Sequence, residues 1–534
     1  MIKGLKIIAA QVNPTVGDLQ GNEEQIQGIW DLWDDSADLI VFPEMVYTGY
    51  PLEDLVLRPS FLAVVRERIE LFADQNKAKK SAVLIGAPWV VDGKTYNACL
   101  LIESGQIRVI LKHDLPNYGV FDEARIFENG PVPDVTEFRG HKLGIMICWD
   151  FWTPKVGAHL KSQGAECLII PNGSTYEMTK YQRRLAEAKK RSDETGLPIL
   201  YLNLVGGQDE IIFDGASFAV NAAGEVSFQM KAFEEDVQLV DTSQSLLGEY
   251  PPKPKAMYQA AMLGLKDYVL KSGFKKVLLG LSGGIDSALT ATIAVDAFGA
   301  ENVQCVMMPS PYTSQESLED AKALAENLGA TYEIISIEPA MKSFSEMVEG
   351  MEGLTHENMQ SRARGVTLMA LSNQSGALLL STGNKSEIAM GYATLYGDMC
   401  GAYNPLKDLY KMQVFALSEL RNDWKPEWAE GPKGQVIPER IITKPPSAEL
   451  RDNQKDEDSL PPYDVLDAIL EDLIEHEMSM DEIVNKGFEK DVVQRVYRSF
   501  HMAEYKRRQS CPGANITTRP FGGRARRYPI VNKY

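Results

Sequence analysis

The chain of 534 residues contains no apolar run of the about 20 residues that a membrane helix requires. Its opening, MIKGLKIIAAQVNP, lacks the apolar core and small-residue cleavage site of a signal peptide, so we expect a cytoplasmic protein without a membrane partner. Only six cysteines are scattered along the chain, with neither a zinc-site spacing nor a disulfide framework. We therefore expect reduced thiols, most of them buried and inert.

Positive charge is also scarce, since 55 Lys and Arg face 74 Asp and Glu and give a formal net charge of −19. This balance argues against general nucleic-acid binding, because a phosphate backbone would be repelled. An anionic substrate must then meet local positive groups, such as loop amides, helix N-termini or single lysines. The length and the 44% hydrophobic fraction predict a soluble globular protein of two or three domains.

The first half of the chain alternates short apolar strands with polar helices. We predict strands at 5–11, 39–42, 82–86, 143–148 and 167–171, a hairpin formed by 96–102 and 106–112, and a strand-rich stretch over 199–242. The Pro-rich, charged segment GEYPPKPK at 248–255 then predicts a linker.

The second half has the rhythm of strand, helix and strand. We predict helices at 257–271, 287–298 and 314–328 and a long one from about residue 358, with strands at 276–281, 303–308, 332–337 and 377–381. This alternation predicts an α/β fold with a mostly parallel sheet covered by helices on both faces.

Three candidate chemical residues stand where predicted strands end: Glu44 after LIVFP, Lys112 after RVIL and Cys148 after GIMI. A thiol that hydrolyses an amide needs a base and a positive donor for the oxyanion. Glu44 could be the base and Lys112 the donor, with the backbone N–H after Cys148 as a second donor. Each alone has a plainer reading, as a buried small hydrophobe, a surface turn or a solvated lysine.

The strings VFPEM, LKHDLPNYGVFDE and ICWDFW resemble the nitrilase superfamily over residues 4–245. The resemblance implies an α-β-β-α sandwich in which Glu44 is the general base, Lys112 stabilises the intermediate and Cys148 is the nucleophile. In the glutaminase branch it implies that Tyr118 and Ser174 hold glutamine, with Lys180 as a weaker candidate contact. The branch usually has an acidic residue directly after the nucleophile, where this chain has Trp149.

The string KVLLGLSGGIDSALTATIAV predicts a strand, a glycine-rich loop and the start of a helix. Its hydroxyls and amides can cradle a phosphate at the positive end of the helix, and Asp286 can bind the Mg²⁺ that accompanies a nucleotide. The loop is not a Walker A motif, because it lacks the Gly-Lys-Ser/Thr ending. A Gly-Gly turn alone is common and mostly structural. The predicted ATP-binding residues here are Gly280, Leu281, Ser282, Gly283, Gly284, Ile285, Asp286 and Ser287.

The string SGGIDS resembles the loop of ATP pyrophosphatases, which by itself leaves asparagine, GMP and NAD synthetases open. Strings at 357–364, 380–411 and 444–464 resemble the NAD synthetases, and the likeness covers about 257–534. The resemblance implies that Thr382, Lys411 and Ser447 contact ATP, that Asn358, Arg362, Glu387 and Lys506 contact deamido-NAD, and that Asp286 and Glu387 bind the metal. Lys506 could instead belong to a solvated basic patch, and Asn358 could be an ordinary first-turn helix residue.

Together the two resemblances indicate the glutamine-dependent NAD synthetase family. They imply a glutaminase domain at 1–246, a linker at 247–256 and a Rossmann-like synthetase domain at 257–534. They further imply that glutamine, ATP with Mg²⁺ and deamido-NAD are the small-molecule partners of a homo-oligomer, and that ammonia passes through an enclosed tunnel. The alternatives are another ammonia-using ligase, a regulatory protein on degenerate enzyme folds, or a free nitrile or amide hydrolase.

Overall fold

The computed structural model describes residues 4–241, 246–452, 454–522 and 526–531. The chain divides into two compact units. Unit 1 comprises Met1–Gln208 and Ile212–Pro251, and unit 2 comprises Asp209–Ile211 and Pro252–Tyr534. Within the described residues, none of the helices is both long and apolar enough to cross a membrane.

Unit 1 contains two large sheets that face each other. The first has the order β14 (Asp236–Leu239), β1 (Ile7–Gln11), β2 (Leu39–Val41), β3 (Ala82–Val91), β4 (Lys94–Glu103), β5 (Gln106–Leu111). The second has the order β15 (Leu246–Leu247), β13 (Val226–Gln229), β12 (Phe218–Val220), β9 (Ile199–Asn203), β8 (Cys167–Asn172), β7 (His141–Ile145), β6 (Thr136–Phe138). A separate hairpin joins β10 (Val205–Gln208) to β11 (Ile211–Asp214).

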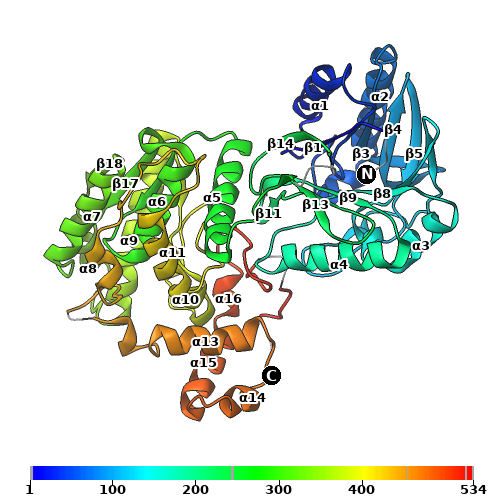
Figure 1. The fold of residues 1–534 in the computed structure, drawn as a ribbon. Coiled ribbons are helices and arrows are strands. Elements are labelled where there is room, and N and C mark those ends of the chain that lie inside the picture. The colour runs from blue at the N-terminus through cyan, green and yellow to red at the C-terminus, as the bar shows by residue number, and fades with distance from the viewer. Residues whose placement is uncertain (1–3, 242–245, 453, 523–525, 532–534) are drawn as a thin grey trace. The chain divides into compact units, whose positions relative to one another are not determined.

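Alternation of side chains along the strands sends apolar residues to both faces of each sheet. Leu39 and Leu84 of the first sheet meet Ile145 and Ile169 of the second in the core between the sheets. Helices α1 (Leu19–Trp33) and α2 (Pro59–Gln75) cover the outer face of the first sheet, and α3 (Pro154–Ser162) and α4 (Lys180–Thr195) cover that of the second. Figure 1 shows these layers, which confirm the predicted α-β-β-α sandwich.

Unit 2 is built on a parallel sheet of order β18 (Thr331–Ile334), β17 (Val303–Met307), β16 (Val277–Gly280), β19 (Leu378–Leu380). Helix α6 (Ile285–Phe298) connects β16 to β17, and α7 (Gln315–Leu328) connects β17 to β18. Helices α8 (Glu338–Met347) and α9 (Leu354–Ser375) then lead the chain back to β19, which pairs with the other edge of β16. Right-handed crossovers therefore put the two pairs on opposite faces, as predicted for a doubly wound fold.

The direction of strand order reverses at β16, because its neighbours β17 and β19 are reached by connections on opposite faces. The loops after β16 and β19 consequently part at the carboxyl edge of the sheet. Ligands of open α/β sheets bind in the crevice at such a switch point. The strand order alone therefore predicts a ligand site at the carboxyl edge of the unit 2 sheet.

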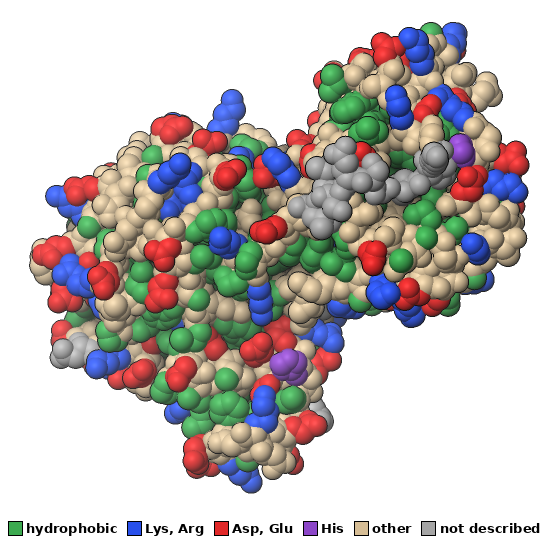
Figure 2. All heavy atoms as spheres, in the orientation of Figure 1, with side chains coloured by type: hydrophobic (Ala, Val, Ile, Leu, Met, Phe, Trp, Pro, Cys, Tyr) green, Lys and Arg blue, Asp and Glu red, His purple; other side chains and the backbone are tan. Residues whose placement is uncertain are grey.

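The rest of unit 2 is helical. These helices are α5 (Lys253–Lys271), α10 (Lys385–Met390), α11 (Lys411–Asp423), α12 (Glu439–Thr443), α13 (Tyr463–Ile474), α14 (Met480–Asn485), α15 (Lys490–Met502) and α16 (Glu504–Arg507). Of them, α5 alone was predicted from the sequence, as a helix at 257–271. On the face shown in Figure 2, acidic and basic side chains are interspersed over the surface.

Two boundaries differ from the sequence prediction. Helix α5 begins at Lys253, inside the segment predicted as a linker, because Pro254 lies in the first turn, where a missing N–H costs nothing. Strand β7 ends at Ile145, and Cys148 opens the short 3₁₀ turn η3 (Cys148–Phe151) instead of closing the strand. The thiol therefore stands on a turn beyond the strand end.

Candidate functional site

The turn after β7 holds Cys148 in a sparsely populated backbone conformation. Its φ of 46° is in the left-handed region, which costs a residue with a Cβ about 1–3 kcal/mol. The buried carboxylate of Asp150 fixes the turn, since Oδ2 accepts from the Ile147 amide at 3.0 Å and Oδ1 from the Asp114 amide at 2.7 Å. Burial raises the pKa of Asp150 to about 6. The strained conformation thus serves to present the thiol.

A fully buried ammonium lies between two carboxylates beside this turn. Lys112, directly after β5, places Nζ 2.7 Å from Glu44 Oε1 and 2.7 Å from Glu123 Oε2. Burial alone would lower the pKa of Lys112, but the carboxylates of Glu123 and Glu44 raise it well above its usual value. The lysine therefore stays charged, and its charge is fully paired.

Glu44 is held in one orientation by two further donors. Asn97 Nδ2 donates to Oε1 at 2.7 Å, and the Gly173 amide donates to Oε2 at 2.7 Å. Gly173 must be glycine, because a Cβ there would lie 2.9 Å from the ring of Tyr50. Burial and the Glu44 carboxylate raise the pKa of Cys148 well above its usual value, while Lys112 and a hydrogen bond from Gly173 oppose the rise. The resting group is a neutral thiol next to a fixed base.

An aromatic cluster extends from the residue after the nucleophile. The ring of Trp149 lies 4.8 Å from that of Tyr118 and 5.8 Å from that of Trp152. Lys180 Nζ lies 4.9 Å from the Trp152 ring and donates to Tyr118 Oη at 3.4 Å. Burial, with Arg184 and Arg183 nearby, lowers the pKa of Lys180 to about 8. Ser174 is buried too, and its hydroxyl accepts from Arg184 Nε at 3.1 Å.

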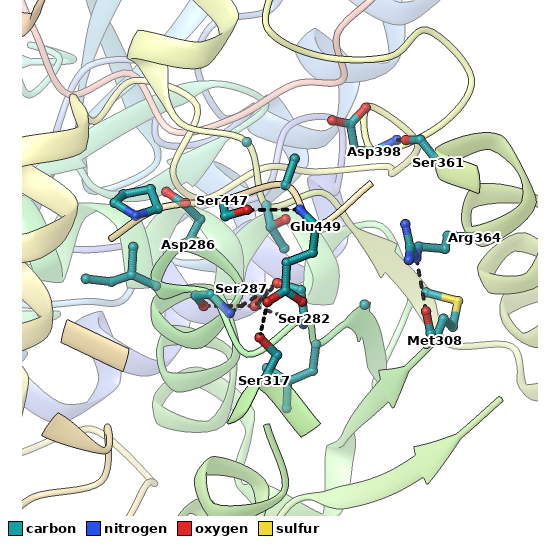
Figure 3. A pocket seen from close by; sticks show the side chains of 18 of the residues that line it. Ser282, Asp286, Ser287, Met308, Ser317, Ser361, Arg364, Asp398, Ser447 and Glu449 are labelled. Carbon is teal, nitrogen blue, oxygen red and sulfur yellow. Dashed lines mark hydrogen bonds between the residues drawn. The ribbon is translucent and has the colours of Figure 1, made fainter. Parts of the chain in front are cut away.

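Unit 2 contains a cavity of about 270 Å³ at the carboxyl edge of its sheet, where β16, β17 and β19 end. Figure 3 shows side chains from several segments pointing into it. Of the residues predicted from the sequence, Gly280, Leu281, Ser282, Gly284, Ile285, Asp286, Ser287, Thr382, Glu387, Lys411 and Ser447 line the cavity. The cavity thus occupies the crevice that the strand order predicts.

The loop between β16 and α6 is shaped by its own hydroxyls and glycines. Ser282 Oγ lies 3.1 Å from Ser287 Oγ and accepts from the Gly284 amide at 3.2 Å. Gly283 has a φ of 78°, and a Cβ there would lie 2.4 Å from the carbonyl oxygen of Ser317. Only glycine allows this contact, which leaves the amides at the start of α6 facing the cavity.

Two carboxylates converge on one lysine at the side of the cavity. Lys411 Nζ lies 2.5 Å from Asp286 Oδ2 and 3.2 Å from Glu387 Oε1, and Asn384 Nδ2 donates to Asp286 Oδ1 at 2.8 Å. Burial raises the pKa of Glu387 to about 8, with Lys411 opposing and Asp286 and Asp456 adding to the rise. The site therefore has three carboxyl groups for one lysine, and Glu387 keeps its proton at pH 7 because its pKa is raised.

A hard divalent cation fits this site, because it would favour the ionised form of Glu387 and pair with the carboxylates. Within the described parts of the chain, no group of three or more acidic, histidine or cysteine side chains is arranged to hold a metal by itself. Asp286 and Glu387 would supply two oxygen ligands and leave the remaining positions to water and phosphate oxygens. That division is typical of Mg²⁺ in nucleotide sites.

Comparisons with known proteins cover the whole chain. The profile of the carbon-nitrogen hydrolase family matches residues 6–252, and that of NAD synthase matches residues 257–510. The glutamine-dependent NAD(+) synthetase of Rhodobacter capsulatus is 48% identical over 550 residues, which is 100% of this chain and 99% of the relative. The chain belongs to the glutamine-dependent NAD(+) synthetase family.

Solved structures agree with this family assignment. The glutamine-dependent NAD+ synthetase of Acinetobacter baumannii, in complex with adenosine diphosphate, is 42% identical, with a TM-score of 0.77 over 99% of this chain and 98% of that one. The glutamine-dependent NAD(+) synthetase of Cytophaga hutchinsonii has a TM-score of 0.84 over 99% of this chain and 98% of that one. At 22% identity the second likeness shows the fold alone.

The family resemblance implied that Asn358, Arg362 and Lys506 contact deamido-NAD. None of these three residues lines the cavity. Asn358 Oδ1 accepts from Thr394 Oγ1 at 2.9 Å, and Arg362 Nε donates to the Leu395 carbonyl at 3.2 Å. Lys506 Nζ donates to the Gly391 and Ala393 carbonyls, each at 2.7 Å. All three hold the loop 391–395, which follows α10. Lys506 therefore has a defined structural contact and is not simply a solvated basic residue.

The sequence did not reveal several residues of the Cys148 cluster in unit 1 and of the cavity in unit 2. Glu123 is the second carboxylate on Lys112, and its only signal is its place in the quoted string LKHDLPNYGVFDE. In the cavity the missed residues are Ser361, Arg364, Asp398 and Glu449. Glu449 Oε1 accepts from Ser317 Oγ at 2.7 Å, a contact across 132 residues that no local pattern reveals.

Proposed function

We propose that this chain converts deamido-NAD⁺, L-glutamine, ATP and water into NAD⁺, L-glutamate, AMP and diphosphate. The observation that supports this most is the buried cluster of Cys148, Glu44 and Lys112 in unit 1 of a chain whose unit 2 has the SGGIDS loop at the cavity of its sheet edge. We assign residues 1–246 to the glutaminase domain and 257–534 to the synthetase domain, joined by 247–256.

In the glutaminase reaction Glu44 takes the proton of Cys148 as the sulfur attacks the amide carbon of glutamine. The ammonium of Lys112 and the Trp149 amide stabilise the oxyanion that forms. The C–N bond then breaks, the leaving nitrogen takes up the proton, and ammonia departs from a thioester. Water, activated by Glu44, hydrolyses the thioester to glutamate and restores the thiol.

Glutamine is held by Tyr118, Ser174 and Lys180, where the charge of Lys180 meets the α-carboxylate. Because the pKa of Lys180 is lowered to about 8, it is charged at pH 7 and loses its proton as the pH rises through 8. We expect the KM for glutamine to rise about tenfold between about pH 7 and about pH 9.5. A pH profile of KM measures this, and Lys180→Arg should flatten it because arginine stays charged. A wild-type KM that is constant over this range would contradict the role.

In the synthetase reaction a carboxylate oxygen of deamido-NAD⁺ attacks the α-phosphorus of ATP, and diphosphate leaves. Ammonia then attacks the acyl carbon and AMP leaves with the bonding electron pair. The Ser282, Gly284 and Ser287 donors and the charge of Lys411 orient the phosphates, with Thr382 and Ser447 also at the cavity wall. Asp286 and Glu387 would hold Mg²⁺, which neutralises phosphate charge when it is bound.

We retain Asn358, Arg362 and Lys506 as residues that shape the deamido-NAD site through the loop 391–395. An enclosed route would keep the ammonia neutral, because desolvation disfavours ammonium. This route, a homo-oligomeric state and a cytoplasmic location are further parts of the proposal.

The test is an assay with deamido-NAD⁺, ATP and glutamine labelled at the amide nitrogen, with unlabelled ammonium present at a concentration too low to drive synthesis by itself. We expect NAD⁺, glutamate and AMP in equal amounts, with the label retained in the new amide of NAD⁺. Absence of NAD⁺ would refute the proposed reaction. Equal product amounts with an unlabelled amide would refute only the enclosed route.

A further inference from the structure

A hydrogen-bonded network in unit 1 ends at the residue that precedes the connection to α5. Tyr250 stacks on Tyr181, with ring centroids 3.8 Å apart and an interplanar angle of 4°. Its hydroxyl donates to Asp214 Oδ2 at 2.9 Å. Burial and the Asp214 carboxylate raise the pKa of Tyr250, so the hydroxyl keeps its proton. This segment, predicted as a linker, is therefore specifically bound at Tyr250.

Asp214 connects Tyr250 to a buried arginine. Asp214 and Arg184 are both fully buried, and Arg184 Nη1 lies 2.7 Å from Asp214 Oδ1. The other N–H groups of Arg184 donate to one short segment of the chain. Nε donates to Ser174 Oγ at 3.1 Å, and Nη2 donates to the carbonyls of Ser174 and Thr175 at 2.8 and 3.0 Å. The position of Ser174 thus depends on how the Asp214 carboxylate holds this guanidinium.

Ser174 follows directly on Gly173, whose amide contacts both the base and the nucleophile. The Gly173 amide donates to Glu44 Oε2 at 2.7 Å and also hydrogen-bonds to the thiol of Cys148. A shift of Ser174 would therefore move the amide that orients the catalytic pair. The path from Tyr250 to Glu44 consists of these hydrogen bonds and the backbone of Ser174 and Gly173.

The chain that follows Tyr250 is stiff. Pro251 and Pro252 come next, and α5 begins at Lys253. Proline fixes its own φ and restricts the residue before it, so two prolines in a row absorb little rotation. A displacement of the backbone at the start of α5 would therefore be transmitted to Tyr250.

We propose that Tyr250 is a positioning residue of the glutaminase site and that the path through Asp214, Arg184 and Ser174 makes glutamine hydrolysis respond to the state of the synthetase half. This proposal rests on the proposed function and assigns the residues through which its two reactions are coupled. The coupling is measured as the increase in glutaminase rate when deamido-NAD⁺ and ATP are added.

Tyr250→Phe tests the positioning role, because it removes one hydroxyl and keeps the stacked ring. Loss of a donor to a buried carboxylate should raise the KM for glutamine about tenfold and reduce the stimulation, while ammonium-driven synthesis stays within about twofold. The matched control is Tyr181→Phe, which removes the hydrogen bond to Gln229 Oε1 at 2.8 Å but leaves Asp214 satisfied. We expect it to leave all three quantities unchanged. Equal effects of the two variants, or none from Tyr250→Phe, would overturn the positioning role.

A second variant separates transmission from folding. Replacing Pro251 and Pro252 together by glycine leaves every hydrogen bond of the path in place and makes the connection flexible. We expect basal glutaminase activity and the KM for glutamine to be unchanged and the stimulation by deamido-NAD⁺ and ATP to be lost. Undiminished stimulation would overturn the transmission route. A wild-type enzyme without any glutaminase activity would instead refute the proposed function itself.

Discussion

Replacing Cys148 with alanine is expected to abolish NAD⁺ synthesis from glutamine and to leave synthesis from added ammonium unchanged. A thioester requires a sulfur nucleophile, which Cys148 supplies, while Glu44 and Lys112, paired at 2.7 Å, serve as base and oxyanion donor. Loss of a covalent nucleophile that acts together with its base typically lowers the rate by about 10⁴-fold or more. The measurement is NAD⁺ formation with each nitrogen source at saturating ATP and deamido-NAD⁺.

The matched control is Cys167→Ala, in strand β8 of the sheet that also carries the nucleophile. Cys167 is fully buried, and burial raises the pKa of its thiol to about 12, which makes it inert. The control should keep both activities. Survival of glutamine-driven synthesis in Cys148→Ala would show that another group is the nucleophile, and loss of both activities would show that the variant damages more than the thiol.

Asp286→Asn should reduce NAD⁺ synthesis and leave glutamine hydrolysis in place, the reverse of Cys148→Ala. The substitution keeps the shape of the side chain but removes a charge that Lys411 contacts at 2.5 Å and that would bind Mg²⁺. Synthesis from glutamine and from ammonium should both fall by about 10²- to 10³-fold, because the electrostatic support of adenylation is lost from either route. Basal glutamine hydrolysis should persist, since its residues belong to unit 1.

Glu316→Gln is the control for Asp286→Asn, because Glu316 is an exposed first-turn residue of α7 that does not line the cavity. It should leave synthesis intact. Titrating Mg²⁺ in both variants distinguishes the roles of Asp286: a raised Mg²⁺ requirement in Asp286→Asn supports metal binding. Full synthesis by Asp286→Asn at low Mg²⁺ would contradict the proposed role.

The sequence predicted those parts of the sites whose position follows from local order. Glu44 and Lys112 each stand just after a strand of one sheet, and the sandwich brings Cys148 from the facing sheet to them. Glu123 was missed because it opens the short 3₁₀ turn η2 (Glu123–Arg125), which is too short for any periodicity to predict the direction of its side chain. Its pairing with Lys112 is a consequence of tertiary packing.

In unit 2 the glycine-rich loop was predicted because a strand, a turn and a helix are all local. The cavity wall formed by Glu449 was not, since it reaches Ser314 and Ser317 from a loop more than 100 residues away in the chain. The sandwich and the parallel sheet are confirmed. The start of α5 at Lys253 shows that proline-rich composition indicates a stiff connection as well as a loose one.

The reversal of strand order at β16 has a consequence for how the nucleotide site tolerates change. Two backbones diverge there, so the hollow between them exists whatever side chains stand on its rim. Substitutions on that rim would alter which nucleotide is preferred and how tightly it is held. They would leave the divergence of the two loops in place, because it follows from the path of the main chain.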